Sequence, residues 1–599
     1  MGLKKVVLLS LTLFGCSEPP LEAPKGISVA ISVPNNWQQF RQQRLSEIEK
    51  FIAENKVSYD RFADFPVSQT DGVPYIMLKL LPIVAPGLWP DNDNFLSVIG
   101  LFKDERNPSY PIARGIGFSG LSRSLDKEVV DVASFTCGGC HIGRVRNDDG
   151  KIEYLDGGIN SEFNTVGFRK RMVDTFDKLT TGIKGEAEKE KKLAAIFLQA
   201  LQKVEKNRPG YFYNNYQFEE RHFDTNYEQQ QIALFKAQAN KLIPAYSKRI
   251  REVYSGWKTL VEKNYKSAEK EMMMGFGGME DAISFNSVDA YLNLEKKPVI
   301  SLFSGLALAD YAAVTDIMAV WDQQKRNPRW NESKDDLIDG GGQWNGHIPL
   351  LIYKNIAAQL TLGVNNIDIQ VSAFSEILLD KLPAPAYPFD VDSDLANKGK
   401  ALFEKNCLAC HQDNNGKVYK NIGTHKGRAK IAGKIITTGA VSGFTDVCSP
   451  DLVIEMFGKD TKPCGSYKGV SLKGKDKLAM TRPSRHEGYN ALPLIGIWAQ
   501  APYLHNGSVP TIYHLLMPKK RPEAFIKSKL SYDKEKLGFD WQLDETAVEE
   551  GYLYNTTISR AIGRHGHDKD IEMNGTTYRL DWTDDEDSVK AIIEYMKVL

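Results

Sequence analysis

The sequence has no excess of either charge and no long apolar run after its first residues. Lys plus Arg and Asp plus Glu each number 76, so the net charge is zero and favours no nucleic-acid partner. No later stretch is apolar enough to cross a membrane as a helix. What remains, 42% apolar and 25% charged residues in a chain of 599, is typical of a globular protein with room for several domains.

Cysteine is also scarce, but four of the seven cysteines stand in two C-x-x-C-H motifs. The motifs are Cys137-Gly138-Gly139-Cys140-His141 and Cys407-Leu408-Ala409-Cys410-His411. Random placement predicts about 0.001 copies of such a motif. Two thiols at this spacing can reach the two vinyl groups of one porphyrin, and the adjacent histidine can turn onto its iron. The sequence therefore predicts two covalently bound haem c groups with His141 and His411 as proximal ligands. Zinc sites built from the same residues are the alternative.

The N-terminus has the pattern of an export signal. Lys4-Lys5 precedes an apolar stretch that is too short to span a bilayer. The ending Leu13-Phe14-Gly15-Cys16 resembles a bacterial lipoprotein cleavage site. We therefore expect a signal peptide over residues 1–15 and a lipid anchor on Cys16, on the periplasmic side. Retention at the inner membrane is associated with an aspartate at the position of Glu18. Because a glutamate stands there, the sequence favours anchoring at the outer membrane. A plain secretory signal is the alternative.

Two cysteines remain, Cys448 and Cys464. Export agrees with the haem motifs, because haem c is attached outside the bacterial inner membrane. In such an oxidising compartment, a disulfide between these cysteines would add about 3 kcal/mol to stability. The sequence does not establish that their Cα atoms come close enough for the bond.

Prolines and helical periodicity divide the rest of the chain, and the clearest boundary is the proline-rich LPAPAYPF before the second motif. We expect a tether at 16–36, an N-terminal region with the first haem site at 37–165, an insertion that shapes access to this haem at 166–380, and a cytochrome c domain at 389–599. Apolar periodicity predicts helices over 37–54, 185–206, 225–262 with an interruption near Pro244, and 350–380.

The last part of the chain has the local pattern of a cytochrome c domain. Asp392-Ser393 can cap a helix over 395–406, in which Gly399 and Phe403 share one face. Thr583 to Glu586 reads as a capping box before a last helix. In cytochrome c folds these two helices cross, with the glycine allowing close approach and the aromatic ring filling the gap. Met596, on the last helix, is expected to be a core residue.

The segment WAQAPYLHNGSVPTIYHLL, from Trp498 to Leu516, resembles a motif of the dihaem c-type peroxidase superfamily. Together with LPAPAYPF and a Gly-His near the C-terminus, it resembles the branch that holds the rubber oxygenases and the dihaem unsaturated-fatty-acid dioxygenases. The resemblance is specific over about 385–599 and weaker around 105–165. It implies a mainly α fold of two cytochrome c-like haem domains, with long helical and loop insertions and little β structure.

The resemblance also implies that the two haems have different functions. The N-terminal haem keeps an axial position open for O₂ or peroxide, and the C-terminal haem transfers electrons. The leading expectation is an enzyme that uses O₂ to oxygenate a C=C bond of a hydrophobic unsaturated lipid or isoprenoid. The alternatives are a peroxidase that takes H₂O₂ and electrons from a small donor cytochrome, and an electron-transfer cytochrome without catalysis. The identity of the substrate is not encoded in any motif.

The sixth ligand of the C-terminal haem is expected near the end of the chain. Gly563-Arg564-His565-Gly566-His567 resembles the family's Gly-Asn-x-Asn-x-Gly-His stretch, whose last histidine is the distal ligand, although the asparagines are absent. The resemblance therefore implies His567, with His565 as the second candidate. Met480 or Met573 would serve if this haem had His/Met ligation.

Residues 275–286 resemble the family stretch that runs over the first haem. An aromatic side chain there shields bound O₂ in the oxygenases, which implies Phe285, or Phe276 if the alignment slips. A peroxidase needs an acid–base group instead, and Glu280 is the candidate. His347 is a further candidate for a place near the first iron.

Two residues of the motif from Trp498 onward are expected near the second haem. His505 would hydrogen-bond a haem propionate or lie on the electron path, with an ordinary turn histidine as the alternative. Trp498 would line the region between the haems, with core packing as the alternative. The family's peroxidases also bind calcium between domains, but no acidic loop here requires that cofactor.

Overall fold

The computed structural model describes residues 31–122, 128–264, 315–326, 330–331, 336–337, 355, 358–359, 368–413, 415, 418–429, 488–527, 529–543 and 551–599. Several predicted features lie outside these residues, and the structure says nothing of them. They are the signal peptide with Cys16, the segment 275–286 with Phe276, Glu280 and Phe285, and the residues His347, Cys448, Cys464 and Met480.

The described residues form many helices and only small sheets. The helices are α1 (Trp37–Glu54), α2 (Lys56–Ala63), α3 (Tyr75–Lys79), α4 (Leu81–Val84), α5 (Cys137–His141), α6 (Thr165–Leu179), α7 (Glu186–Asn207), α8 (Thr225–Asn264), α13 (Ile369–Lys381), α14 (Ser393–Asn406), α18 (Ile512–Leu516) and α20 (Glu586–Val598). Short 3₁₀ turns are η1 (Phe95–Ile99), η2 (Ser119–Leu121), η4 (Gln323–Lys325), η5 (Ile497–Gln500), η6 (Pro518–Lys520) and η7 (Arg560–Ile562).

One sheet has three strands in the order β1-β3-β2, made of β1 (Val73–Pro74), β2 (Ile116–Phe118) and β3 (Val132–Phe135). The others are two-stranded antiparallel pairs. Their strands are β4 (Ile142–Arg146) with β5 (Ile152–Asp156), β6 (Tyr216–Phe218) with β7 (Arg221–Phe223), β8 (Trp330–Asn331) with β9 (Asp336–Leu337), β10 (Val418–Tyr419) with β11 (Tyr489–Asn490), β12 (Ala524–Lys527) with β15 (Tyr552–Asn555), β13 (Tyr532–Asp533) with β14 (Gly538–Phe539), and β16 (Ile571–Met573) with β17 (Thr576–Tyr578).

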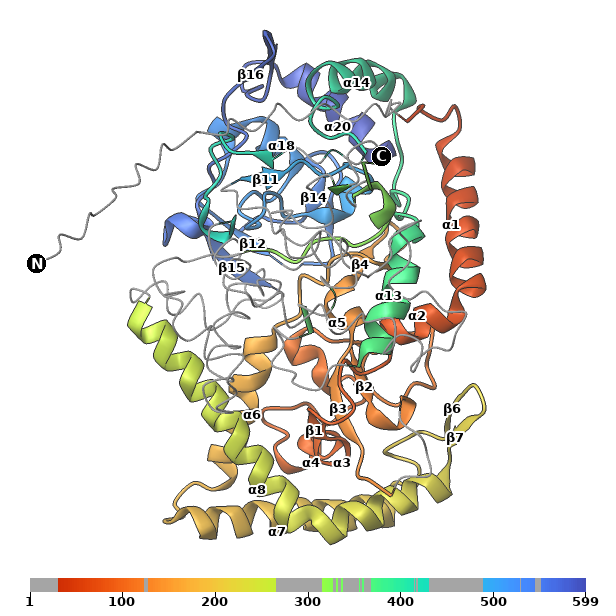
Figure 1. Ribbon diagram of the computed structural model, residues 1–599, viewed down its shortest axis with the longest axis vertical. Helices are drawn as coiled ribbons and strands as arrows, with labels where there is room; N and C mark the ends of the chain where they lie inside the picture. Colours follow the sequence, from red (N-terminus) through yellow and green to blue (C-terminus); the bar gives the residue numbers. More distant parts are fainter. Residues whose placement is uncertain are drawn as a thin grey trace, which may run out of the picture.

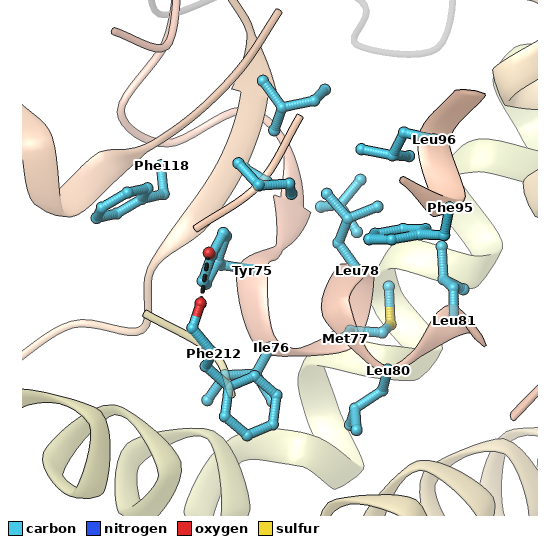
Figure 2. Close-up of a cluster of buried hydrophobic side chains, with 14 of the residues drawn as sticks. Tyr75, Ile76, Met77, Leu78, Leu80, Leu81, Phe95, Leu96, Phe118 and Phe212 are labelled. Carbon is cyan, nitrogen blue, oxygen red and sulfur yellow. Dashed lines mark hydrogen bonds between the residues drawn. The ribbon is translucent and has the colours of Figure 1, made fainter. Parts of the chain in front are cut away.

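The first half of the chain folds around a core beside the three-stranded sheet. Figure 2 shows its centre, where side chains of α3 and α4 meet Phe95 and Leu96 of η1. Tyr75 is fully buried there, and its hydroxyl donates to Phe212 O at 2.7 Å. Helix α7 lies at the bottom of Figure 1, and α8 packs against both α7 and α6 as it rises from there along one side.

The expected interruption of the long helix near Pro244 is wrong. Helix α8 continues from Thr225 to Asn264 with Pro244 inside it, and Figure 1 shows that it changes direction sharply part-way along, so the helix is kinked rather than interrupted. A proline removes one backbone hydrogen bond and kinks a helix, but packing can compensate. Helix α8 packs against α6 and α7, and its residues Phe235 and Ile243 are fully buried in the same core cluster.

The second half is organised by the crossing of α14 and α20, near the top of Figure 1. A Cβ atom on Gly399 would lie 1.8 Å from Ala591 O, so only glycine permits this approach. The ring of Phe403 lies 5.2 Å from that of Tyr595, centroid to centroid. The predicted contact of Gly399 and Phe403 with the last helix is therefore confirmed.

The predicted capping box of the last helix is wrong in register. Asp585 caps α20 by accepting from Ser588 N, and Glu586 is the first helical residue. Thr583 does not cap the helix, because its hydroxyl donates to Asp581 at 2.5 Å. Adjacent acidic residues offered competing caps, and only the tertiary structure decides between them.

The end of the expected tether is attached to the second half of the molecule. Tyr595 Oη donates to Ile31 O at 3.0 Å, and Ser393 Oγ donates to Pro34 O at 3.1 Å. Helix α1, which begins at Trp37 as predicted, is held to the same half by the indole, which donates to Phe389 O at 2.8 Å. No helix in the described parts of the chain is both long and apolar enough to cross a bilayer.

Candidate functional site

The first C-x-x-C-H motif forms α5, a single helical turn, so both cysteines and the histidine are displayed within one turn. We call Cys137, Cys140 and His141 the first site. Close approaches of neighbouring backbone favour glycine at both positions between the cysteines. A Cβ on Gly138 would lie 2.9 Å from Ala63 O, and Gly139 packs against the backbone of Gly115. Packing thus favours glycine at the two positions between the cysteines, which the motif itself leaves open.

Burial favours the neutral forms of His141 and Cys137 at the first site. It lowers the pKa of His141 to about 4, an effect that the facing backbone of Met318 partly offsets, and it raises the pKa of the Cys137 thiol to about 11. His141 Nδ1 is buried and has no hydrogen-bond partner among the described residues. A neutral imidazole is the form in which a histidine binds a haem iron.

The second motif follows the C-terminus of α14 directly. We call Cys407, Cys410 and His411 the second site. Cys407 N donates to Phe403 O at 2.8 Å and His411 N donates to Cys407 O at 3.0 Å, which folds the motif into a turn. His411 Nδ1 lies 2.6 Å from Leu492 O and donates to it. This bond leaves Nε2 as the atom available to a metal, in the manner typical of ligating histidines.

The second site opens into a hollow with an empty volume of about 1320 Å³. Part of this volume is open to solvent. We call it the second-site hollow. Its walls are mainly apolar, with Leu492, Ile497, Leu516 and Met596 among them, and they include both cysteines and both His411 and His567. An apolar hollow with paired thiols on one wall fits a covalently attached porphyrin. The predicted core residue Met596 thus also borders the candidate cofactor.

His411 and His567 face each other across this hollow. Their ring centroids are 6.2 Å apart and their planes are inclined by 44°. A metal–imidazole bond of about 2.0 Å, with the nitrogen about 1.1 Å from its ring centroid, separates two rings on one metal by about 6 Å. The spacing of the two rings would allow both imidazoles to hold one haem iron between them. His565 does not compete for this place, because its side chain is 80% exposed beside Asp568.

An unusual backbone turn holds His567 in this position. His567 has φ +52° and Gly566 has φ +118°, where a Cβ would lie 2.2 Å from Thr424 Oγ1. The buried guanidinium of Arg521 donates to Arg564 O at 2.6 Å and Gly566 O at 2.9 Å. Burial lowers the pKa of His567 to about 3, so the imidazole is neutral. The role of Arg521 was missed by sequence reasoning, since nothing local distinguishes it from the lysines before it.

His505 and Trp498 have different surroundings. His505 is 3% exposed, lines the second-site hollow and stacks on Tyr489, with ring centroids 4.4 Å apart. The indole of Trp498 donates to Pro385 O at 3.0 Å, packs against Tyr387, and is not part of the hollow's lining. Core packing is the role that these contacts give to Trp498, and a cofactor contact for it stays a prediction.

A short segment that sequence reasoning missed connects the two sites. Thr315 Oγ1 and Asp316 N donate to His505 O at 2.9 and 2.7 Å, and the backbone of Met318 faces His141. Asp316 is anchored by a buried ion pair, in which Lys527 Nζ lies 2.6 Å from Oδ1. We call residues 315–318 the linking segment. No local sequence pattern marks this segment, because its partners His505 and Lys527 lie far away in the sequence.

His514, in the same region as His505, is a buried histidine without a place in the hollow. It is 3% exposed, and its Nδ1 lies 2.8 Å from Thr511 Oγ1. Burial, with smaller effects of Lys536 and Arg521, lowers its pKa from 6.5 to about 3. The unfolded chain therefore takes up a proton on this group below about pH 6.5, whereas the folded protein does not until about pH 3.

This difference makes His514 a source of acid sensitivity. We expect the free energy of unfolding to fall as pH falls from 7 to 5, and His514→Gln to reduce that fall by about 2 kcal/mol. Urea unfolding of both proteins at the two pH values measures the effect. Equal losses of stability in the two proteins would contradict the assignment.

Comparison with known proteins finds a family match for residues that line the second-site hollow. Residues 488–526 match the RoxA-like, cytochrome c-like domain, and residues 57–141, which end on the histidine of the first site, match the Y4iN-like domain. The C-terminal half thus contains a RoxA-like cytochrome c-like domain. Such a domain implies haem c and is consistent with a haem-based oxidoreductase. Among the described residues, no group of three or more His, Cys, Asp or Glu is placed to hold a metal ion directly.

Three curated relatives come from Sinorhizobium fredii and are described as uncharacterized proteins. Protein y4iM is 35% identical over 299 residues, which are 48% of this chain and 65% of the relative. Protein y4iJ is 23% identical over 346 residues, 49% of this chain and 56% of the relative. Protein y4iN is 27% identical over 158 residues, 24% of this chain and 74% of the relative. The chain thus spans less than two thirds of the first two relatives.

Proposed function

We propose that the protein is an exported dihaem c oxidoreductase that uses O₂ at the first site to oxygenate a C=C bond of an unsaturated lipid or isoprenoid. The observation that carries the proposal is the pairing of His411 with a second imidazole, that of His567, at 6.2 Å across the second-site hollow. This pairing assigns electron transfer to the second site and makes the first site the candidate for O₂ binding. When bound, a haem with an open axial position supplies a site for O₂ or peroxide, and one with both positions filled supplies electron transfer.

The chain's own residues would prepare each site for its role. Leu492 O accepts from His411 and so fixes the ring's tautomer and direction, while Arg521 fixes the turn that carries His567. At the first site, Met318 and the packed glycines of the motif position His141. Phe285, or Glu280 in a peroxidase, would act on the other face of that site.

The linking segment supports electron exchange between the sites. Asp316 of this segment donates to His505, which lines the second-site hollow. Met318, two residues further along, faces His141 of the first site with its backbone. A rigid connection of this kind, held by the buried pair of Asp316 and Lys527, suits two cofactors that must keep a fixed separation. The two-domain cytochrome c organisation, the lipid anchor at Cys16 and a hydrophobic substrate are parts of the same proposal and rest on the sequence.

Oxygen uptake tests the proposed reaction. We expect the purified, reduced protein to consume O₂ only when an unsaturated isoprenoid or fatty acid is present, and to form an oxygenated product in proportion. His141→Ala should abolish the uptake, because it removes the ligand of the reacting haem, whereas His565→Ala should leave it unchanged.

Two outcomes would replace the proposal. Rapid consumption of H₂O₂ with oxidation of a reduced small cytochrome, and no reaction with alkenes, would establish the peroxidase. No reaction with O₂, peroxide, CO or cyanide would establish an electron-transfer cytochrome.

A further inference from the structure

Besides the candidate iron ligand His567, three side chains around the second-site hollow have buried polar atoms without any partner among the described residues. They are both amide atoms of Asn490, both ring nitrogens of His505, and the hydroxyl of Thr424. The residues are 5%, 3% and 8% exposed, and all three line the hollow. Buried polar groups are almost always hydrogen-bonded, so each such group calls for an explanation. Their concentration around one cavity indicates that they serve whatever the cavity holds.

The three residues come from separate segments that the fold brings together. Asn490 lies on β11, opposite Val418 of β10. Its neighbour Tyr489 stacks on His505 and donates through its hydroxyl to His425 O at 2.6 Å, one residue after Thr424. The carbonyl of His505 is fixed from behind by the linking segment. The ring of His505 is therefore held rigidly, although its nitrogens have no partner in the described chain.

The chemistry of the three side chains favours an anion. A neutral imidazole offers one N–H, an amide offers two, and a hydroxyl offers one, so the group presents several donors. Burial and the positive charges of His425 and Arg428 lower the pKa of His505 to about 3, which keeps it neutral in a positive field. The same side chains also carry acceptors, but the neighbouring positive charge disfavours a cation, so the donors are the groups that suit a ligand with carboxylate oxygens.

We infer that Thr424, Asn490 and His505 donate hydrogen bonds to the propionate carboxylates of the haem of the second site. We call these residues the propionate cradle. The inference rests on the proposed function, because it requires haem in the second-site hollow. It adds that the carboxylate edge of the porphyrin lies toward β11 and the turn of His505. Thr424 also contacts Gly566, so the cradle and the turn that carries His567 share one support.

Resonance Raman spectroscopy of the holoprotein tests the cradle, since the propionate bending modes respond to hydrogen bonding. We expect His505→Phe and Asn490→Leu each to shift a propionate bending band and to lower the reduction potential of the second haem. The potential falls because carboxylates without donors keep more negative charge near the iron and so favour its oxidised form. His505→Gln keeps a donor and should restore the band toward its original position.

The matched control is His514→Phe, which removes an equally buried histidine from outside the hollow and should change neither the band nor the potential. If a phenylalanine at 505 prevents folding, Thr424→Val removes one donor with little change of shape and should shift the same band by less. Unchanged bands and potentials in the variants, with both haems still attached, would overturn the cradle. Failure of the unmodified protein to hold two haems would instead overturn the proposed function.

Discussion

Replacing His567 by alanine is expected to turn the second haem from a six-coordinate into a five-coordinate centre that binds CO. The expectation follows from the 6.2 Å separation of the His411 and His567 rings, which leaves room for one iron between them. The unmodified, reduced protein should bind one equivalent of CO, at the first haem, and His567→Ala should bind two. Titration with CO, followed in the Soret region, measures the stoichiometry.

His565→Ala is the matched control, since it removes the neighbouring histidine, whose side chain is 80% exposed. It should bind one equivalent, as the unmodified protein does. Arg521→Met is expected to give an intermediate result, because it removes the donors that hold the turn at Gly566 and leaves the imidazole in place. One equivalent of CO bound by His567→Ala would show that another residue supplies the sixth ligand.

The second large effect is expected at the helix crossing that supports the second motif. Gly399→Ala places a methyl group 1.8 Å from Ala591 O and 2.4 Å from Ala591 C, so the helices α14 and α20 must separate. In an exposed helix the same change would stabilise the protein by about 1 kcal/mol. Here we expect a loss of about 3 kcal/mol in the free energy of unfolding, as for overpacked cores. Urea unfolding followed by circular dichroism gives the value.

Lys398→Ala provides the control, because Lys398 precedes Gly399 on α14 and is exposed. Its effect should stay within about 0.5 kcal/mol. Cys407 follows α14 directly. A displacement of α14 in the Gly399→Ala variant should therefore also shift Cys407 and the second site. A stability of Gly399→Ala equal to or above that of the unmodified protein would contradict the close crossing.

Local patterns predicted the parts of the structure that local physics decides. The helix from Trp37 to Glu54, the cap at Asp392 and the face shared by Gly399 and Phe403 follow from periodicity, capping and spacing within a few residues. The two C-x-x-C-H motifs likewise carry their chemistry within five residues. His567 was reached through a family resemblance, and the structure brings it opposite His411.

The features that sequence reasoning missed depend on partners far away in the chain. Arg521 is distinctive only because it meets the carbonyls of Arg564 and Gly566. Asp316 is distinctive only because Lys527 lies buried against it. Pro244 does not end its helix, which is continuous from Thr225 to Asn264 and packs against α6 and α7. No signal short of the tertiary fold could assign these roles.

The central claim is that one chain carries two covalently attached haems with unequal axial coordination. The most direct measurement combines the intact mass of the purified protein with its CO stoichiometry in the reduced state. The account predicts a mass increase of two haem groups and one bound CO per chain. Fewer than two attached haems, or two bound CO molecules, or none, would contradict it.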